Sequence, residues 1–225
     1  MIRGVVFDLD HTLFDRYATL TAISPYFCSY FDVSSGMTPE RLAPIWCQAD
    51  KDFVHLGWGR MLSEMTKQGV FRTPPTLEVF SAFLLGMFRR ISVPFPETKP
   101  LLRQLRADGY KLGLITNGSG ATQRAKLRNL DLENSFDQVV ITGEFGEHKP
   151  SAAPFLAAAR WLGAKPGELL YVGDNPLNDV DASRNAGYIP VWVRTTGTWV
   201  YPDIAKPDLQ IDHIRELPEL LKSLR

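Results

Sequence analysis

The chain has 225 residues, of which 44% are hydrophobic and 22% are charged, a composition typical of globular proteins rather than disordered ones. Its 25 basic and 25 acidic side chains give a formal net charge of zero, and the absence of one-sided charge runs argues against nucleic-acid or membrane partners. The sequence contains neither an 18-residue apolar stretch nor a signal peptide, so we expect a cytoplasmic protein. The length favours one domain with a sizeable insertion, and the sequence leaves open whether the protein is a monomer or a homodimer.

The first predicted strand, Val5-Val6-Phe7, ends in the segment Asp8-Leu9-Asp10-His11-Thr12. A buried strand would place Asp8 at its carboxyl end, and Asp10 can turn toward the same point. Two like charges about 4 Å apart repel by roughly 4 kcal/mol at an effective dielectric constant of about 20. The pair therefore needs a divalent cation, a shared proton or a lysine, unless the acids only close the strand and Thr12 caps a helix.

Residues 15–94 have a helical pattern. Apolar and aromatic side chains recur there at spacings of three and four, as in Phe27, Tyr30 and Phe31, without the alternation that is typical of strands. We therefore expect about four helices, inserted as one domain between the first strand and the rest of the sheet. The proline-rich segment 93–96 is a candidate hinge.

Beyond residue 95, short apolar runs alternate with helical patterns. Strands are predicted at 110–115, 139–141, 169–172 and 189–193, and helices at 97–108, 122–130, 152–162 and 178–186. This alternation predicts an α/β fold, with parallel strands covered by helices on both faces. Residues 1–14 and 95–225 would form this core, which binds ligands beyond the carboxyl ends of its strands.

Polar side chains stand at four of these predicted strand ends. Asp8 and Asp10 follow the first, Thr116 and Asn117 the second, Lys149 a loop after the third, and Asp174 and Asp179 the fourth. Each segment alone could be an ordinary turn or surface loop. All four together predict one crevice that holds several acids, a hydroxyl, an amide and a lysine.

This set of groups suits phosphoryl transfer through a carboxylate nucleophile. Asp8 would attack phosphorus and form an aspartyl-phosphate. Mg²⁺ would bind the Asp8 and Asp174 side chains and the main-chain carbonyl of Asp10. Asp179 would orient Lys149 or a water on the metal without itself being a metal ligand.

The remaining groups would bind the phosphate and move protons. The Thr116 hydroxyl, the Asn117 amide and Lys149 would hold the transferring phosphoryl oxygens, where electrostatic stabilisation supplies most of the catalysis. Asp10 would protonate the leaving alcohol and then accept a proton from the attacking water.

The segments FDLDHT, TNG, HKP and GDNPLND, in this order, resemble the four motifs of the haloacid dehalogenase-like (HAD) hydrolase superfamily. The resemblance implies a Rossmann-like core with an inserted helical C1 cap, Mg²⁺ dependence and phosphatase activity on a small phosphorylated substrate, with Asp8 as nucleophile and Asp10 as acid/base. His11 departs from the pattern, since Gly or Asn is common there. The segment GEFGEHKP most resembles the branch containing nucleotidases, N-acylneuraminate-9-phosphatases and phosphoglycolate phosphatases.

Several alternatives share part of this pattern. A phosphomutase would carry every motif, whereas a haloacid dehalogenase needs neither the second acid nor a metal cluster. A receiver domain would be about half as long, with its phosphorylated aspartate in mid-chain. The intact acids and lysine argue against a non-catalytic metal-binding protein.

The sequence does not identify the substrate. Side chains of residues 15–94 that face the crevice should determine it, and Arg16, Tyr17, Trp58 and Arg60 are candidates of equal standing. His55 and His213 show no partners in the sequence pattern and are assigned no role.

Overall fold

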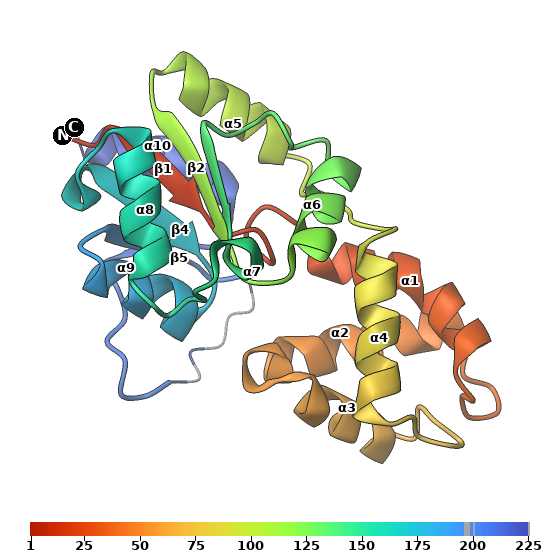
Figure 1. Ribbon diagram of the computed structural model, residues 1–225. Coiled ribbons are helices and arrows are strands. Elements are labelled where there is room, and N and C mark those ends of the chain that lie inside the picture. The colour runs from red at the N-terminus through yellow and green to blue at the C-terminus, as the bar shows by residue number, and fades with distance from the viewer. Residues whose placement is uncertain (196–198, 200, 225) are drawn as a thin grey trace.

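The computed structural model describes residues 1–195, 199 and 201–224. Within these residues six parallel strands form one sheet in the order β3-β2-β1-β4-β5-β6 (Figure 1). The strands are β1 (Gly4–Phe7), β2 (Lys111–Thr116), β3 (Gln138–Ile141), β4 (Leu169–Gly173), β5 (Ile189–Val193) and β6 (Leu209–Ile211). The predicted α/β fold with a parallel sheet is confirmed.

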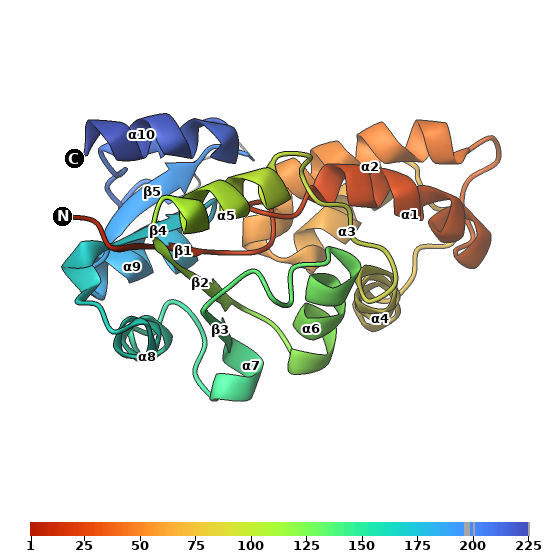
Figure 2. The same cartoon turned by 90° about the horizontal axis from the view of Figure 1, so that it is seen from above.

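Helices cover both faces of the sheet, because side chains alternate between the faces along each buried strand. In β1, Val5 and Phe7 join the hydrophobic core on one face, and Val6 joins the core on the other. The helices α5 (Thr98–Ala107) and α10 (Leu217–Ser223) lie on the first face, and α8 (Ala153–Leu162) and α9 (Ala182–Asn185) lie on the second (Figure 2).

The strand order places a topological switch point beside β1. From β1 the chain builds outward through β2 and β3 on one side, and through β4, β5 and β6 on the other. In open parallel sheets, ligands bind outside the carboxyl ends of the strands at such a point. The carboxyl ends of β1 and β4 are therefore the expected place for a site.

The helical insert lies beyond this edge of the sheet as a separate lobe (Figure 1). It comprises α1 (Arg16–Tyr30), α2 (Pro39–Phe53), the short 3-10 helix η1 (Val54–Leu56), α3 (Trp58–Lys67) and α4 (Leu77–Phe88). The Phe27 ring lies at the centre of an aromatic cluster, 4.7 Å from the Trp46 ring and 6.3 Å from the Phe80 ring between centroids. The expected helical insert is confirmed.

The two segments that connect the insert to the core lie side by side. The main-chain N–H of Asp15 donates to the carbonyl of Val93 at 2.8 Å, and the N–H of Val93 donates to Oγ1 of Thr19 at 2.9 Å. Asp15 also caps α1, because its side chain accepts a hydrogen bond from the N–H of Ala18 at 2.8 Å. These contacts fix the direction in which the insert leaves the core.

Several elements differ from the sequence prediction. The helix predicted at 178–186 is a π-helical turn over Pro176–Asp181 followed by α9, because Pro176 and the Asn175 cap start the helix early. The short helix α7 (Thr142–Phe145) follows β3 directly. The strand β6 and the helix α10 were not predicted, since a three-residue strand gives almost no periodic signal.

Among the described residues, no helix combines the length and apolar character needed to span a bilayer.

Candidate active site

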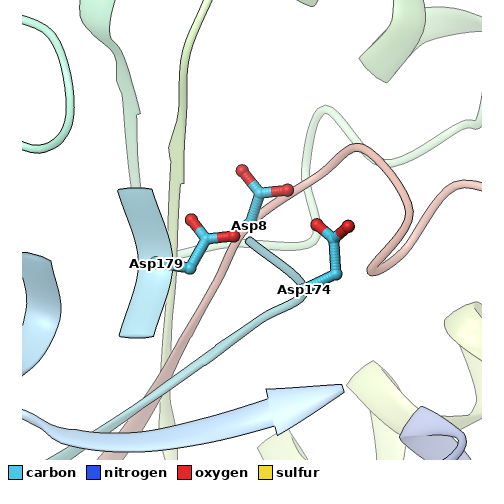
Figure 3. Close-up of side chains that lie close together, drawn as sticks. All are labelled: Asp8, Asp174 and Asp179. Atoms are coloured by element: carbon cyan, nitrogen blue, oxygen red, sulfur yellow. The ribbon is translucent and has the colours of Figure 1, made fainter. Parts of the chain in front are cut away.

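Three buried carboxylates gather at the carboxyl ends of β1 and β4. Asp8, Asp174 and Asp179 each offer an oxygen, and the three oxygens lie within 4.8 Å of one another (Figure 3). Strand register produces this arrangement, because Phe7 pairs with Val172 and the N–H of Asp8 donates to the carbonyl of Val172 at 2.9 Å. We call these three residues the carboxylate triad.

Gly173, the last residue of β4, allows the third carboxylate to approach. A Cβ atom at this position would lie 2.5 Å from Cγ of Asp179, which is closer than real Cβ contacts. The N–H of Asn175 donates to Oδ2 of Asp179 at 2.9 Å and fixes the orientation of the carboxylate. The small residue before Asp174 is therefore a steric requirement of the triad.

Lys149 reaches the triad from the loop after α7. Its ammonium group donates to Oδ1 of Asp8 at 2.7 Å, to Oδ1 of Asp179 at 2.6 Å and to the hydroxyl of Tyr171 at 3.0 Å. Although burial opposes it, the negative charges of Asp179 and Asp8 raise the pKa of Lys149 well above its usual value. The lysine therefore remains charged and holds two of the carboxylates.

Asn117 holds the loop that carries Lys149. Its side-chain amide donates to the carbonyl of Lys149 at 3.1 Å, and its Oδ1 accepts from the N–H of Lys149 at 3.0 Å. The hydroxyl of Thr142 donates to the same oxygen at 3.0 Å. The side chain of Asn117 thus fixes the lysine loop, whereas its predicted contact with a phosphate stays a prediction.

The triad carries more negative charge than its single lysine can neutralise. Burial raises the pKa of Asp8 to about 7; Lys149 opposes this shift, and Asp179 and Asp10 add to it. Burial, with Asp179 and Asp8 nearby, also raises the pKa of Asp174 well above its usual value. The site therefore favours a proton or a cation between its carboxylates.

Asp10 lies in a different environment, although it is only two residues from Asp8. The ammonium group of Lys126 contacts both Asp10 oxygens, at 2.7 and 2.8 Å, and Nη1 of Arg16 lies 3.7 Å from Oδ1. Although burial opposes it, the positive charges of Lys126 and Arg16 lower the pKa of Asp10 to about 2. The Asp10 carboxylate is thus paired with cations rather than with the triad.

Thr116 and Asp10 share one partner. Nε2 of Gln123 donates to Oγ1 of Thr116 at 2.6 Å and to Oδ2 of Asp10 at 3.2 Å. Gln123 and Lys126 lie three residues apart on α6 (Gly120–Asn129) and therefore on one side of that helix. We call Gln123 and Lys126 the α6 clamp.

His11 and Asp50 form a buried junction between the core and the helical insert. The backbone of His11 has φ 60°, a left-handed conformation that Gly and Asn adopt most readily. Its Nε2 lies 3.1 Å from Oδ2 of Asp50. The Asp50 carboxylate also accepts from Nε of Arg16, at 3.0 Å on Oδ1 and 3.1 Å on Oδ2. The side chain of His11 therefore contacts α2 through Asp50, and the backbone conformation explains why Gly or Asn is common here in related motifs.

His55 contacts the site, contrary to our expectation that it has no partner. Its Nδ1 lies 2.9 Å from Nδ2 of Asn175, and its Nε2 lies 3.4 Å from Oδ2 of Asp174. Burial lowers the pKa of His55 to about 4, so the ring is neutral at pH 7. Because the amide nitrogen of Asn175 can only donate, Nδ1 of the neutral ring accepts and Nε2 carries the proton. At 3.4 Å from Asp174, Nε2 makes no hydrogen bond to it.

These groups line a polar cavity of about 280 Å³ between the sheet and the insert. Of the four specificity candidates, Arg16 and Trp58 are lining residues. Tyr17 packs against the His11 ring instead, at 5.1 Å between centroids, and Arg60 is exposed on α3. A larger cavity of about 770 Å³ lies beside the N-terminus and α10, at the amino ends of the strands and away from the triad.

The donor set of the triad fits a hard divalent cation. Oδ2 of Asp174 is buried and accepts no hydrogen bond from the described residues, although a buried acceptor normally has a partner. Mg²⁺ prefers oxygen ligands and usually binds through one or two carboxylates together with substrate phosphate. The described residues can therefore hold Mg²⁺ at the triad.

Comparison with known proteins decides the family. Residues 5–193 match the haloacid dehalogenase-like hydrolases. The chain belongs to this family. The HAD match includes β1, the helical insert and the strand ends that carry the triad, so it covers both regions that line the cavity.

The relatives of this HAD chain include phosphatases with different substrates. It is 39% identical to a glyceraldehyde 3-phosphate phosphatase of Methanopyrus kandleri over 58% of each chain. It is 29% identical to human N-acylneuraminate-9-phosphatase, over 99% of this chain and 95% of the relative. The expected phosphatase class is confirmed by these relatives.

The L-2-haloacid dehalogenase of Xanthobacter autotrophicus shares the fold. Its structure superposes with a TM-score of 0.68 over 100% of both chains, at 20% identity. This likeness confirms the HAD fold and does not bear on the reaction.

Sequence reasoning missed the α6 clamp, His55 and Asp50. A signal for the clamp was present, because Gln123 and Lys126 follow the Thr-Asn-Gly turn at helical spacing. His55 and Asp50 gave no such signal, since each reaches the site through the packing of the insert against the core.

Proposed function

We propose that this HAD chain is a Mg²⁺-dependent phosphomonoester hydrolase that forms an aspartyl-phosphate on Asp8. The observation that carries the proposal is the buried carboxylate triad, which shares one lysine, next to a second acid held in a separate, cationic environment. The two carboxylates stand in different surroundings: burial raises the pKa of Asp8 to about 7, whereas Lys126 and Arg16, although burial opposes them, lower that of Asp10 to about 2. Asp8 would therefore need the cation to act as an ionised nucleophile, and Asp10 would need a proton from the bound substrate to act as an acid.

The side chains of Asp8 and Asp174 and the main-chain carbonyl of Asp10 would hold Mg²⁺. When bound, the ion would neutralise the triad and the negative charge of the phosphate oxygens. Asp179 would act through Lys149, to which it already bonds at 2.6 Å.

In the first step, a carboxylate oxygen of Asp8 attacks phosphorus while the bond from phosphorus to the substrate oxygen breaks. Asp10, which its cations keep ionised in the free site, would take the proton of the phosphate monoanion when the substrate binds, give it to the leaving oxygen and release an alcohol. In the second step, Asp10 takes a proton from water, the water oxygen attacks phosphorus, and the bond to Asp8 breaks. Inorganic phosphate leaves and Asp8 is regenerated.

Thr116, Asn117 and Lys149 would hold the phosphoryl oxygens during both steps. All three residues line the cavity. Asn117 also fixes the Lys149 loop through its side-chain nitrogen and its side-chain oxygen. Fixed donors of this kind stabilise the charge that develops on the transferring group.

Residues 15–94 would form a cap domain over the catalytic core of residues 1–14 and 95–225. The insert contributes Arg16, Val54, His55 and Trp58 to the cavity lining, so it would exclude water and select the leaving group. A cavity of about 280 Å³ that is lined mainly by polar and charged residues suits a small phosphorylated metabolite, such as a nucleotide, a sugar phosphate or a phosphoglycolate-like ester.

The test is phosphate release from a panel of phosphomonoesters with Mg²⁺, with EDTA, and with EDTA followed by excess Mg²⁺. We expect turnover that disappears with EDTA and returns with Mg²⁺. Chloride release from 2-chloropropionate, measured in parallel, tests the dehalogenase alternative. Pure protein that releases chloride, or that hydrolyses no phosphomonoester, would contradict the proposal.

A further inference from the structure

Both residues of the α6 clamp are buried polar side chains that contact the Asp10 carboxylate. Only 4% of the surface of Lys126 is exposed, and 1% of that of Gln123. The Lys126 ammonium also lies 5.3 Å from the centroid of the Phe14 ring and 5.2 Å from that of Phe88. Burying an ion pair costs desolvation energy that often exceeds its attraction, so stability alone does not explain a lysine here.

The contacts of the clamp fix the orientation of the acid. Lys126 contacts both Asp10 oxygens, and Gln123 bonds to one of them. The carboxylate therefore cannot rotate about its terminal bond without losing two hydrogen bonds. The Asp10 side chain is nevertheless 27% exposed and lines the cavity, so a substrate can reach it.

Gln123 also links the acid to the phosphate side of the site. Its amide bonds to Thr116 and to Asp10 at the same time. Because α6 carries both clamp residues, this one helix sets the distance between Thr116 and Asp10. Thr116 would hold a phosphoryl oxygen, and Asp10 would protonate the ester oxygen.

We propose that Lys126 and Gln123 are positioning residues, which hold Asp10 in line with the leaving oxygen of the substrate. This inference rests on the proposed function. It gives a role to Lys126 and Gln123, which have none in the proposed function. Lys126 bonds to Asp10 and not to Thr116, so its loss should affect proton transfer to the leaving oxygen and not phosphate binding.

The test compares an ester that needs a proton on departure with one that does not. 2-Glycerophosphate releases an alkoxide-like oxygen, whereas 4-nitrophenyl phosphate releases a stabilised phenolate. We expect Lys126→Met to lower kcat/KM for 2-glycerophosphate by about 10- to 100-fold. We expect it to lower kcat/KM for 4-nitrophenyl phosphate by less than about 3-fold, since general acid catalysis contributes little there.

Two variants control for a structural effect. Lys126→Arg keeps the charge and the donors and should restore most of the activity with 2-glycerophosphate. Lys99→Met removes a different lysine–aspartate pair, the exposed contact with Asp131 at 2.8 Å, and should leave both esters unchanged. If Lys126→Met does not fold, Lys126→Gln, which removes the charge with a shorter polar side chain and leaves the Gln123–Thr116 hydrogen bond intact, should give the same selective loss.

The outcomes separate the two proposals. Wild-type protein that hydrolyses neither ester overturns the proposed function and this inference with it. Wild-type protein that hydrolyses both, together with clamp variants that lose both to the same degree or lose neither, overturns only the positioning role.

Discussion

The two sides of the cavity hold the same kind of side chain in opposite surroundings. At the carboxylate triad, three acids have one lysine, which bonds to two of them, and burial raises the pKa of Asp8 to about 7. At the α6 clamp, a single acid faces Lys126 and Arg16, and the pKa of Asp10 falls to about 2. Asp8 and Asp10 are both aspartates and lie two residues apart, so their surroundings cause the difference between their pKa values.

From this difference in surrounding charge we infer a different task for each side of the cavity. The triad side lacks positive charge, so it should bind a cation and the phosphoryl group. The clamp side has positive charge in excess, which keeps Asp10 ionised in the free site. Its hydrogen bonds hold the carboxylate in one orientation, so Asp10 would accept a proton once the substrate is bound and pass it to the leaving oxygen. Changing one residue on each side should therefore produce different kinds of defect.

The largest effect should come from Asp8→Asn, on the triad side. The amide cannot attack phosphorus, and we expect kcat to fall by about 10⁵-fold, as when other enzymes lose their nucleophile. The control is Asp131→Asn, the same change at an exposed aspartate, and it should retain full activity. Phosphate release under saturating substrate measures both variants, and residual activity within tenfold of wild type would exclude Asp8 as nucleophile.

On the clamp side, Asp10→Asn should lower kcat by about 10³-fold, because proton transfer is lost while the nucleophile remains. Mg²⁺ binding should persist, since the Asp10 side chain is bonded to Lys126 and stands apart from the triad. Isothermal titration with Mg²⁺ measures this directly. Loss of Mg²⁺ binding in this variant would show that the Asp10 carboxylate belongs to the metal site.

Asp50→Ala should destabilise the protein without altering the triad. The change leaves Arg16 buried without its partner, which typically costs about 3–5 kcal/mol in the free energy of unfolding. Asp52→Ala, on the same helix but exposed, should change it by less than about 0.5 kcal/mol. Urea unfolding of the two variants and the wild type makes the comparison, and equal midpoints for both variants would contradict the assigned junction.

A smaller effect is the pH dependence of stabilisation by Mg²⁺. The pKa of Asp8 is about 7 in the metal-free fold and near 3.8 when the chain is unfolded. The metal-free fold therefore loses stability as the pH rises from about 4 through 7, because the proton that it favours is removed. Mg²⁺ should raise the melting temperature more at pH 8 than at pH 5.5, and a larger rise at pH 5.5 would contradict the triad as the binding site.

The triad side could be predicted from sequence because strand periodicity determines it. An apolar run that ends in a polar residue identifies a strand end, and parallel strands bring their carboxyl ends to one edge. Asp8, Asp174 and Lys149 therefore meet although 141 residues separate Asp8 from Lys149. The sequence also shows the glycine before Asp174, but it does not show the steric reason why a glycine is needed there.

The clamp side could be predicted only in part, because helix rotation and packing determine it. Helical spacing predicts that Gln123 and Lys126 lie on one side of α6. It does not predict that this side faces Asp10, which is 116 residues from Lys126. The contacts of His55 depend on how the insert lies against the core, and no local pattern encodes that. The left-handed backbone of His11 is likewise a property of the folded loop.

The most direct test of the central claim is to trap the covalent intermediate. Asp10→Asn should allow attack by Asp8 on 4-nitrophenyl phosphate but slow the hydrolysis that follows. After acid quenching and proteolysis, mass spectrometry should find one phosphoryl group on Asp8, only with Mg²⁺ present and not in the double variant Asp8→Asn/Asp10→Asn. Turnover of wild-type protein with no phosphoryl group on Asp8, or with one on another residue, would contradict the account.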